Sequence, residues 1–245
     1  MLRFFSKIRF KLAAENKVGR YMRYAIGEIV LVVIGILIAL QINNWNEKHK
    51  LNKEKKLYIE SLINDYAQDT IMLTANIART DIQVKKLRNL RERIFQPNAN
   101  LDTIIAVAKS IGGVLTPKLT FNTNTFDSME SSGKLDLFED HIKTQIFAHN
   151  NLEKLVLEIF EDAEDNTKQK FILYAEKYTL GVNSPGYYDN LSWKIENERE
   201  FVMLFSDYIL SNRFASEEIY LRGFKELLAK TKQLILLLKE EQDND

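Results

Sequence analysis

Cysteine is missing from the 245 residues, and proline and glycine are scarce, at three and nine residues. The lack of cysteine excludes disulfides, thiol catalysis and zinc sites built on cysteine. Few helix-breaking residues, combined with abundant Leu, Ile, Lys and Glu, favour long helices. No segment alternates apolar and polar residues for long enough to predict a strand. The expected fold class is therefore all-α.

Residues 24–42 form the longest apolar run of the chain and read YAIGEIVLVVIGILIALQI, with one charge at Glu28. A run of about 18 or more apolar residues spans the hydrocarbon core of a bilayer as a helix. Two alternatives are a buried core helix of a soluble domain and a secretory signal peptide. The run exceeds the ~7–15 apolar residues of a signal peptide, and no small-x-small pair follows it. The run therefore predicts a single transmembrane helix.

Aromatic residues flank this run at both ends. Tyr21 and Tyr24 stand at its entry, and Trp45 stands just beyond its exit. Amphipathic rings favour the headgroup region of a bilayer. The three residues are therefore candidate interfacial anchors.

Within the span, one charged residue and three small residues are candidates for contact with a partner helix. Glu28 lies about one turn inside the entry, where its carboxylate either reaches the interface or makes a polar contact in the membrane. Gly27, Gly35 and Ala39 leave room for a second helix to approach, and Gly35 and Ala39 form a small-xxx-small pair.

Positive charge near the span predicts its orientation. Seven Lys and Arg residues precede the span and five follow it closely. Because Lys and Arg stay on the cytoplasmic side, we expect a cytoplasmic N-terminus. In a bacterium this places the span in the inner membrane and residues 43–245 in the periplasm.

The net charge of zero hides a strong asymmetry. Residues 1–56 hold 12 Lys and Arg against 4 acidic residues, whereas residues 57–245 hold 22 against 30. The basic part suits anionic lipid, which makes membrane lipid one expected partner. The acidic remainder lacks the basic surface that nucleic-acid binding needs. The sequence therefore predicts no nucleic-acid partner.

The chain is expected to have three parts. Residues 1–23 form a basic segment whose stretch 2–12 has an apolar stripe and suits an interfacial amphipathic helix. Residues 24–42 form the transmembrane helix. Residues 43–245 form a helical extramembrane domain, into which the membrane helix continues.

Apolar spacing predicts the helices of that domain. The first continues from the span to the Gln96-Pro97 turn, and a short one covers 101–110. Another begins at Asn124, where Asn124 and Asp127 resemble a capping box, and stops by Gly133. A long helix starts near Asp136, with a predicted buried stripe of Leu152, Val156, Ile159, Ala163, Phe171, Tyr174 and Tyr178.

The C-terminal third begins with a strong turn signal at residues 181–186, followed by aromatic residues expected to pack that turn. A helix over 198–210 precedes a final helix whose apolar residues alternate steps of three and four, as in a coiled-coil seam. We expect the long helices to pack as antiparallel neighbours. The predicted seam comprises Leu221, Phe224, Leu228, Thr231, Ile235 and Leu238.

The sequence shows no catalytic or metal-binding constellation. His141, Gln145 and His149 share one helix face, but no Glu or Cys completes a zinc motif. The acidic run 158–165 is typical of a solvated helix face, because paired catalytic carboxylates need a cleft between them. No cofactor or metal is therefore expected, and no enzyme.

Three stretches resemble one known family. They are YAIGEIVLVVIGILIALQINNWNE at 24–47, the preceding RFFSKIRFKLAAENKVGRYMRY and TFDSMESSGKLDLFEDHIKTQIFAHNN at 125–151. Together they resemble uncharacterised single-pass membrane proteins of the Bacteroidota, a family defined by a domain of unknown function. The resemblance implies an inner-membrane location and supplies no activity, so no catalytic residue follows from it.

These observations favour a membrane-anchored interaction or scaffold protein that binds itself or a partner membrane protein. The alternative is a periplasmic ligand-sensing helical module that signals through a separate membrane partner. An enzyme is the least favoured reading, because the residues offer no set that could perform catalysis.

Overall fold

The computed structural model describes residues 18–111, 117–178 and 197–244, which form helices and loops without a strand in those ranges. The all-α expectation is confirmed. The chain divides into two compact units, Met1–Lys56 and Leu57–Asp245. The predicted helix at 2–12 and the turn at 181–186 lie outside the described residues.

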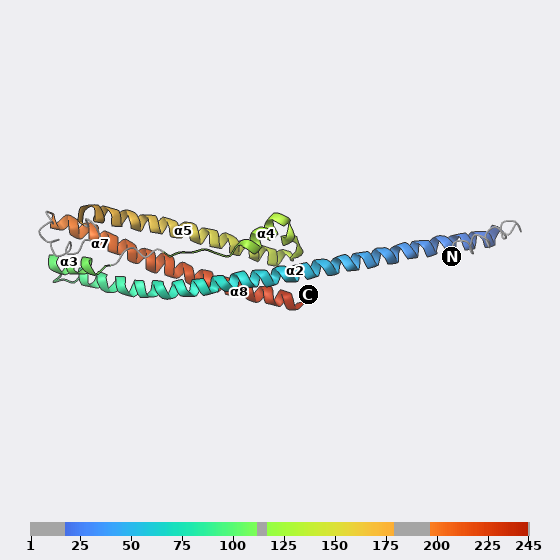
Figure 1. The fold of residues 1–245 in the computed structure, drawn as a ribbon, viewed down its shortest axis with the longest axis horizontal. Helices are drawn as coiled ribbons and strands as arrows, with labels where there is room; N and C mark the ends of the chain where they lie inside the picture. The colour runs from blue at the N-terminus through green and yellow to red at the C-terminus, as the bar shows by residue number, and fades with distance from the viewer. Residues whose placement is uncertain (1–17, 112–116, 179–196, 245) are drawn as a thin grey trace. The chain divides into compact units, whose positions relative to one another are not determined.

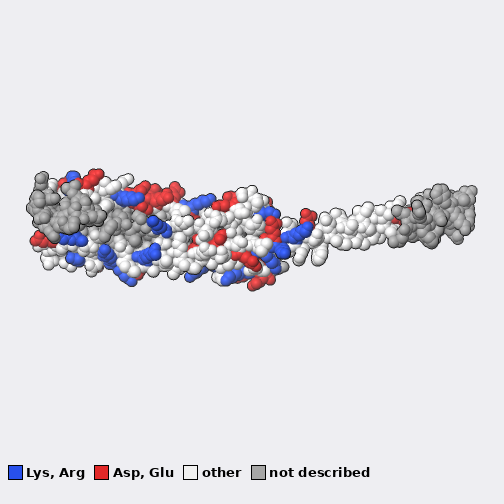
Figure 2. Space-filling model, in the orientation of Figure 1, with Lys and Arg blue, Asp and Glu red and all other residues white. Residues whose placement is uncertain are grey.

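Helix α2, Val18–Ile94, begins in the first unit and ends in the second. Its end agrees with the predicted stop, because the residue before Pro97 is disfavoured in a helix. In the first unit, the most apolar stretch of α2 has none of its residues buried. Figure 2 shows this stretch almost without charge, whereas Leu57–Asp245 carries charges of both signs.

In the second unit, α2 packs with two other long helical segments (Figure 1). Helix α5 covers Asp140–Tyr178. Helix α7, Glu198–Phe214, the π-helical turn η3, Ala215–Leu221, and α8, Arg222–Asn244, follow one another without a break. The sequence predicted two separate helices here. The π turn instead carries the buried face through, with Ser216 and Tyr220 both buried.

Three apolar clusters fix the direction of the helices. Ile59 of α2 packs with Ile142 and Leu234, whereas Leu90 packs with Tyr174 and Phe201. Helices α2 and α5 therefore run parallel, and α7–α8 runs antiparallel to both. The expectation that all long helices are antiparallel neighbours is wrong in this respect.

The connection between α3 and α4 makes the parallel arrangement possible. Helix α3, Leu101–Ser110, packs beside Leu90, whereas α4, Asn124–Ser132, packs beside Ile59. The chain therefore returns along the bundle, and Phe121 joins the middle cluster on the way. The predicted bounds of α3 are confirmed.

The start of α4 differs from the predicted capping box. Thr123 is the N-cap residue, and its side chain makes no capping bond to the backbone. The Asp65 carboxylate of α2 instead accepts from the Thr125 backbone N–H at 3.3 Å and from the Thr125 hydroxyl at 2.5 Å. A carboxylate at a helix N-terminus satisfies donors that lack a partner within the helix.

The start of α5 and one residue of its buried stripe also differ from the prediction. Gly133 has a left-handed φ of 68°, and a 3₁₀ turn, η1, Lys134–Leu137, follows it, so α5 begins at Asp140 rather than near Asp136. Gly133 ends α4 as predicted. On α5, Ile159 is 43% exposed and does not belong to the buried stripe.

The buried face of α8 differs from the predicted seam by one residue at two positions. Leu227 and Leu234 are buried, whereas the predicted Leu228 and Ile235 are half-buried beside them. The structure places four of the six predicted seam residues in the interior: Leu221, Phe224, Thr231 and Leu238.

Gly223 marks the closest approach of α8 to α5. A Cβ at Gly223 would lie 2.8 Å from Cε1 of Phe160. The Phe160 ring cannot easily move, because it makes edge-to-face contacts with the rings of Tyr220 and Phe224, whose centroids lie 4.9 and 5.0 Å from its own.

We therefore expect Gly223→Ala to lower the free energy of unfolding. Overpacking costs ~1–3 kcal/mol, whereas replacing glycine in a helix gains only ~1 kcal/mol. Urea unfolding of the detergent-solubilised chain measures the difference, and adding Phe160→Leu should recover part of the loss. An alanine variant as stable as the original chain would contradict the close packing.

Candidate functional site

The most unusual group of residues in the second unit is a set of polar side chains inside the bundle. His149 and Glu153 lie one turn apart on α5 and are 5% and 4% exposed. Tyr66 and Asp69 of α2 and Thr231 of α8 are also buried. Polar groups cost free energy when they are buried, unless they are paired. The pairing of these groups therefore determines what the cluster can do.

A hydrogen-bond chain fixes the tautomer of His149. The Thr231 hydroxyl donates to the Leu227 carbonyl at 2.8 Å, so its oxygen is left to accept from His149 Nε2 at 2.9 Å. The proton of the neutral ring is thus on Nε2. His149 Nδ1 is an acceptor, and it lies 3.4 Å from Glu153 Oε1.

Burial decides whether the Glu153 carboxyl group or Nδ1 of His149 carries a proton at neutral pH. The pKa of Glu153 is raised to about 8, first by burial and then by the Asp69 carboxylate, whose effect exceeds the opposing effect of Lys154. Burial lowers the pKa of His149 to about 4. At neutral pH Glu153 is therefore a carboxylic acid whose proton can face Nδ1 of a neutral imidazole.

Tyr66 and Asp69 enclose this pair from α2. The Tyr66 ring centroid lies 4.8 Å from that of His149. Burial, followed by the nearby Glu153, Asp69 and Asp65, raises the Tyr66 pKa, so its phenol stays protonated. Burial also raises the pKa of Asp69, although hydrogen bonds from Asn122 oppose this.

Asp69 also anchors the segment that precedes α4. Its Oδ1 accepts from the Asn122 side chain at 2.7 Å and from the Asn122 backbone N–H at 3.1 Å. With Asp65 one turn away holding Thr125, two carboxylates of α2 fix the residues around the start of α4. Both carboxylates therefore have a structural role, because they already accept hydrogen bonds from other residues of the chain.

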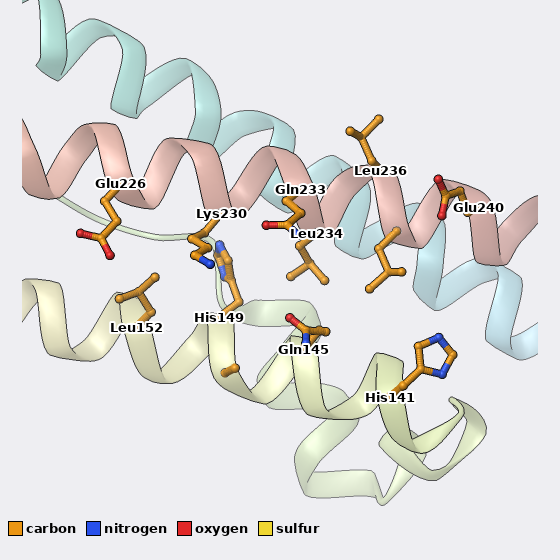
Figure 3. Close-up of a pocket in the computed structure, with 12 residues that line it drawn as sticks. His141, Gln145, His149, Leu152, Glu226, Lys230, Gln233, Leu234, Leu236 and Glu240 are labelled. Carbon is orange, nitrogen blue, oxygen red and sulfur yellow. The ribbon is translucent and has the colours of Figure 1, made fainter.

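A groove of about 710 Å³ opens between α5 and α8 beside the cluster (Figure 3). His141, Gln145 and His149 line it from α5, so the helix face identified in the sequence does meet a cavity. Glu226, Lys230, Gln233 and Glu240 face the opening from α8. No group of three or more His, Asp or Glu residues in the described ranges could hold a metal ion. The groove offers hydrogen-bonding and charged groups to a polar organic ligand.

The predicted partner-helix residues are not among those that line this groove. Gly27, Gly35 and Ala39 are exposed in the first unit, and Glu28 is half-buried there. Trp45 is 71% exposed, and its ring stacks on His49 with centroids 6.0 Å apart.

The remaining predicted features are the interfacial anchors Tyr21 and Tyr24 and the acidic run 158–165. Tyr21 and Tyr24 belong to α2, but their side chains lie outside the described residues. Four members of the acidic run, Glu158, Glu161, Asp162 and Asp165, are exposed, as expected for a solvated face.

Sequence reasoning missed Glu153, Asp69 and Thr231 as partners of one cluster. Glu153 did carry a signal, because it lies on the same helix face as Ile146 and Val156, which are buried. A carboxyl group inside an apolar stripe indicates a buried polar contact. The partners on α2 and α8 could not be deduced in this way, because they are far away in the sequence.

We predict that Glu153→Gln stabilises the chain increasingly as the pH rises from 6.5 to 8. The folded pKa of Glu153, about 8, exceeds its ordinary 4.5, so stability is full below pH 4.5 and falls as the pH approaches 8. This loss amounts to ~2 kcal/mol between pH 6.5 and 8 and is absent in the glutamine variant.

Between pH 6.5 and 8 the change in stability comes from the titration of Glu153 and not from that of His149. The folded pKa of His149, about 4, lies below its ordinary 6.5, so its contribution rises only up to pH 6.5 and is constant above it. Urea unfolding of both proteins across this window measures the effect, with the exposed Glu158→Gln on the same helix as control. A pH-independent difference would show that Glu153 is ionised in the fold.

Comparison with known proteins yields one match. The model of a family of unknown function, DUF6090, matches residues 28–154, which is more than half of the chain. No curated protein and no solved structure matches the chain. The matched residues run from the apolar part of α2 to the Glu153 region of α5. The chain therefore belongs to the DUF6090 family, whose function is unknown.

Proposed function

We propose that this chain is a single-pass protein of the bacterial inner membrane that acts as a helical scaffold for another protein. In this proposal residues 24–42 span the bilayer, the N-terminus is cytoplasmic and residues 43–245 are periplasmic. The protein binds its partner through the helical domain and performs no catalysis.

One observation carries the proposal. The apolar residues between Ala25 and Ile42 are exposed around the whole helix, and none of the most apolar window is buried. Exposed apolar surface costs roughly 25 cal/mol per Å² in water. A bilayer removes this cost, and the helix satisfies its own backbone groups, as a membrane span must.

The second unit supports a binding role rather than a catalytic one. Its buried acid and base, Glu153 and His149, face each other and the Thr231 hydroxyl. Asp65 and Asp69 are occupied with Thr125 and Asn122. The His149–Thr231 bond joins α5 to α8, and the two carboxylates join α2 to the residues around the start of α4.

We expect the full-length chain to sediment with membranes and to need detergent for release. Because the chain has no cysteine, single cysteines report its topology without background. In spheroplasts a membrane-impermeant maleimide should label Ser131→Cys, which is at an exposed position, and should leave Ser6→Cys unlabelled. Lysis should expose Ser6→Cys to the reagent. The reverse labelling would invert the orientation, and a chain in the detergent-free supernatant would refute the anchor.

The groove between α5 and α8 favours a second candidate function, a ligand-sensing module that acts through a separate membrane partner. His149 joins the groove to the buried cluster, because it lines the groove and also bonds to Thr231. A ligand that contacts the ring from the groove would therefore act directly on the contact between α5 and α8.

For this second function we expect a fraction of periplasmic small molecules to raise the unfolding temperature of the chain. Binding to the folded state alone stabilises it by RT ln(1 + [L]/Kd). Lys230→Ala, in the groove, should abolish the rise, whereas Lys232→Ala, exposed and outside the groove, should retain it. Equal shifts in both variants would place the ligand elsewhere.

A further inference from the structure

The outward face of α2 in the second unit carries an uncharged stripe. We infer that this outer stripe is the surface through which two copies of the chain pair, parallel and in register. The inference rests on the proposed membrane anchor, which brings copies together in one orientation. The stripe consists of Leu57, Ser61, Asn64, Gln68, Ile71, Ala75, Ala78 and Ile82.

The spacing of the outer stripe is that of a coiled-coil seam. Its eight members alternate steps of four and three residues, which averages 3.5. Such a repeat keeps the seam facing a partner helix along its whole length. The bundle does not use this face, because α2 packs through other positions, such as Leu62, Tyr66 and Leu73.

All eight residues of the outer stripe are exposed. Its large members, Leu57, Ile71 and Ile82, are 57%, 71% and 69% exposed. No charge interrupts the stripe until Lys85, the next position of the repeat. Charged residues are plentiful elsewhere on this helix, so the uncharged run is not explained by the general composition of its surface.

The smaller members suit close contact between helices. Ala75 and Ala78 let two backbones approach. The Ser61 hydroxyl already donates to the Leu57 carbonyl at 2.9 Å, so burying it leaves no donor without a partner. Asn64 and Gln68 would meet their counterparts in the second copy, and a polar layer of this kind specifies register.

The flanking charges favour the C-terminal half of the outer stripe. In a parallel pair, Asp81 of one copy faces Lys86 of the other, a favourable contact made twice. Glu60 would face Asp65, whose carboxylate is already bonded to Thr125, so the two helices are held less tightly near Ser61 but still meet there. The tightest contact is therefore expected between Ile71 and Ile82.

A tethered protein needs only a modest interface for pairing. Copies held in one bilayer meet at a raised effective concentration, so a short seam can suffice. They also enter the membrane from the same side, which favours a two-fold axis along the membrane normal. A parallel seam on α2 has such an axis, with each residue opposite its own counterpart.

Single cysteines in native membranes test the pairing. Under mild oxidation, Ser61→Cys and Ala78→Cys should each give a disulfide-linked dimer. The two positions are ~26 Å apart along the helix, so only a parallel, in-register pair brings both to their counterparts. Ala106→Cys, exposed on α3, is the matched control and should remain monomeric.

Adding Ile71→Lys or Ile82→Lys to Ala78→Cys should abolish the disulfide-linked dimer. Both isoleucines are largely exposed, so circular dichroism and urea unfolding should be unchanged. Persistence of the dimer in these variants would overturn the role of the outer stripe.

The outcomes also separate the pairing from the anchor. Membrane-bound chains that form no disulfide, or that form one only with a different protein, would overturn the pairing and leave the anchor standing. Dimer at only one of the two cysteine positions would overturn the parallel register. A chain found in the detergent-free supernatant would overturn the anchor, and its disulfides would then still report whether α2 pairs.

Discussion

The packing of one face of α2 against α5 and α8 is the contact on which the rest of the structure depends. Ile59, Leu62 and Leu73 are essentially inaccessible, and each apolar cluster that orders the bundle contains residues of α2. Burying one such side chain stabilises a fold by roughly 1.5–3 kcal/mol. The same helix also supplies Asp65 and Asp69, which hold the start of α4. The direction of α5 follows from this, because its chain begins next to that anchored segment.

Much of this arrangement could be predicted from the sequence, since it depends on local patterns. Proline at 97 and glycine at 133 ended helices where expected, and the spacing of Ala163, Tyr174 and Tyr178 identified the buried face in the second half of α5. The parallel direction of α2 and α5 could not be predicted in this way. It depends on where residues 117–123 run, and the partners that fix this segment, Asn122 and Asp69, are 53 residues apart. The continuous α7–α8 segment was missed because a π turn shifts the phase of the apolar pattern.

In the candidate site, too, the local pattern could be predicted from the sequence, whereas the contacts between distant residues could not. The helix face shared by His141, Gln145 and His149 was visible in the sequence, but its chemistry depends on Thr231 and Glu153. An acid and an imidazole that are both neutral at pH 7 form a contact without net charge, which costs less to bury than an ion pair, although His149 Nδ1 and Glu153 Oε1 lie at 3.4 Å without a hydrogen bond. The His149–Thr231 hydrogen bond therefore adds one directional link between α5 and α8 to the apolar packing of the two helices.

The boundaries of the DUF6090 match acquire a physical meaning from these contacts. Residues 28–154 include both anchoring carboxylates, His149 and Glu153, yet Thr231, Leu234 and Leu238 come from beyond its end. In this chain the matched stretch thus holds only part of the interior of the second unit. The stretch recognised by sequence ends inside α5, whereas the compact unit built around it extends from Leu57 to Asp245 and includes α8.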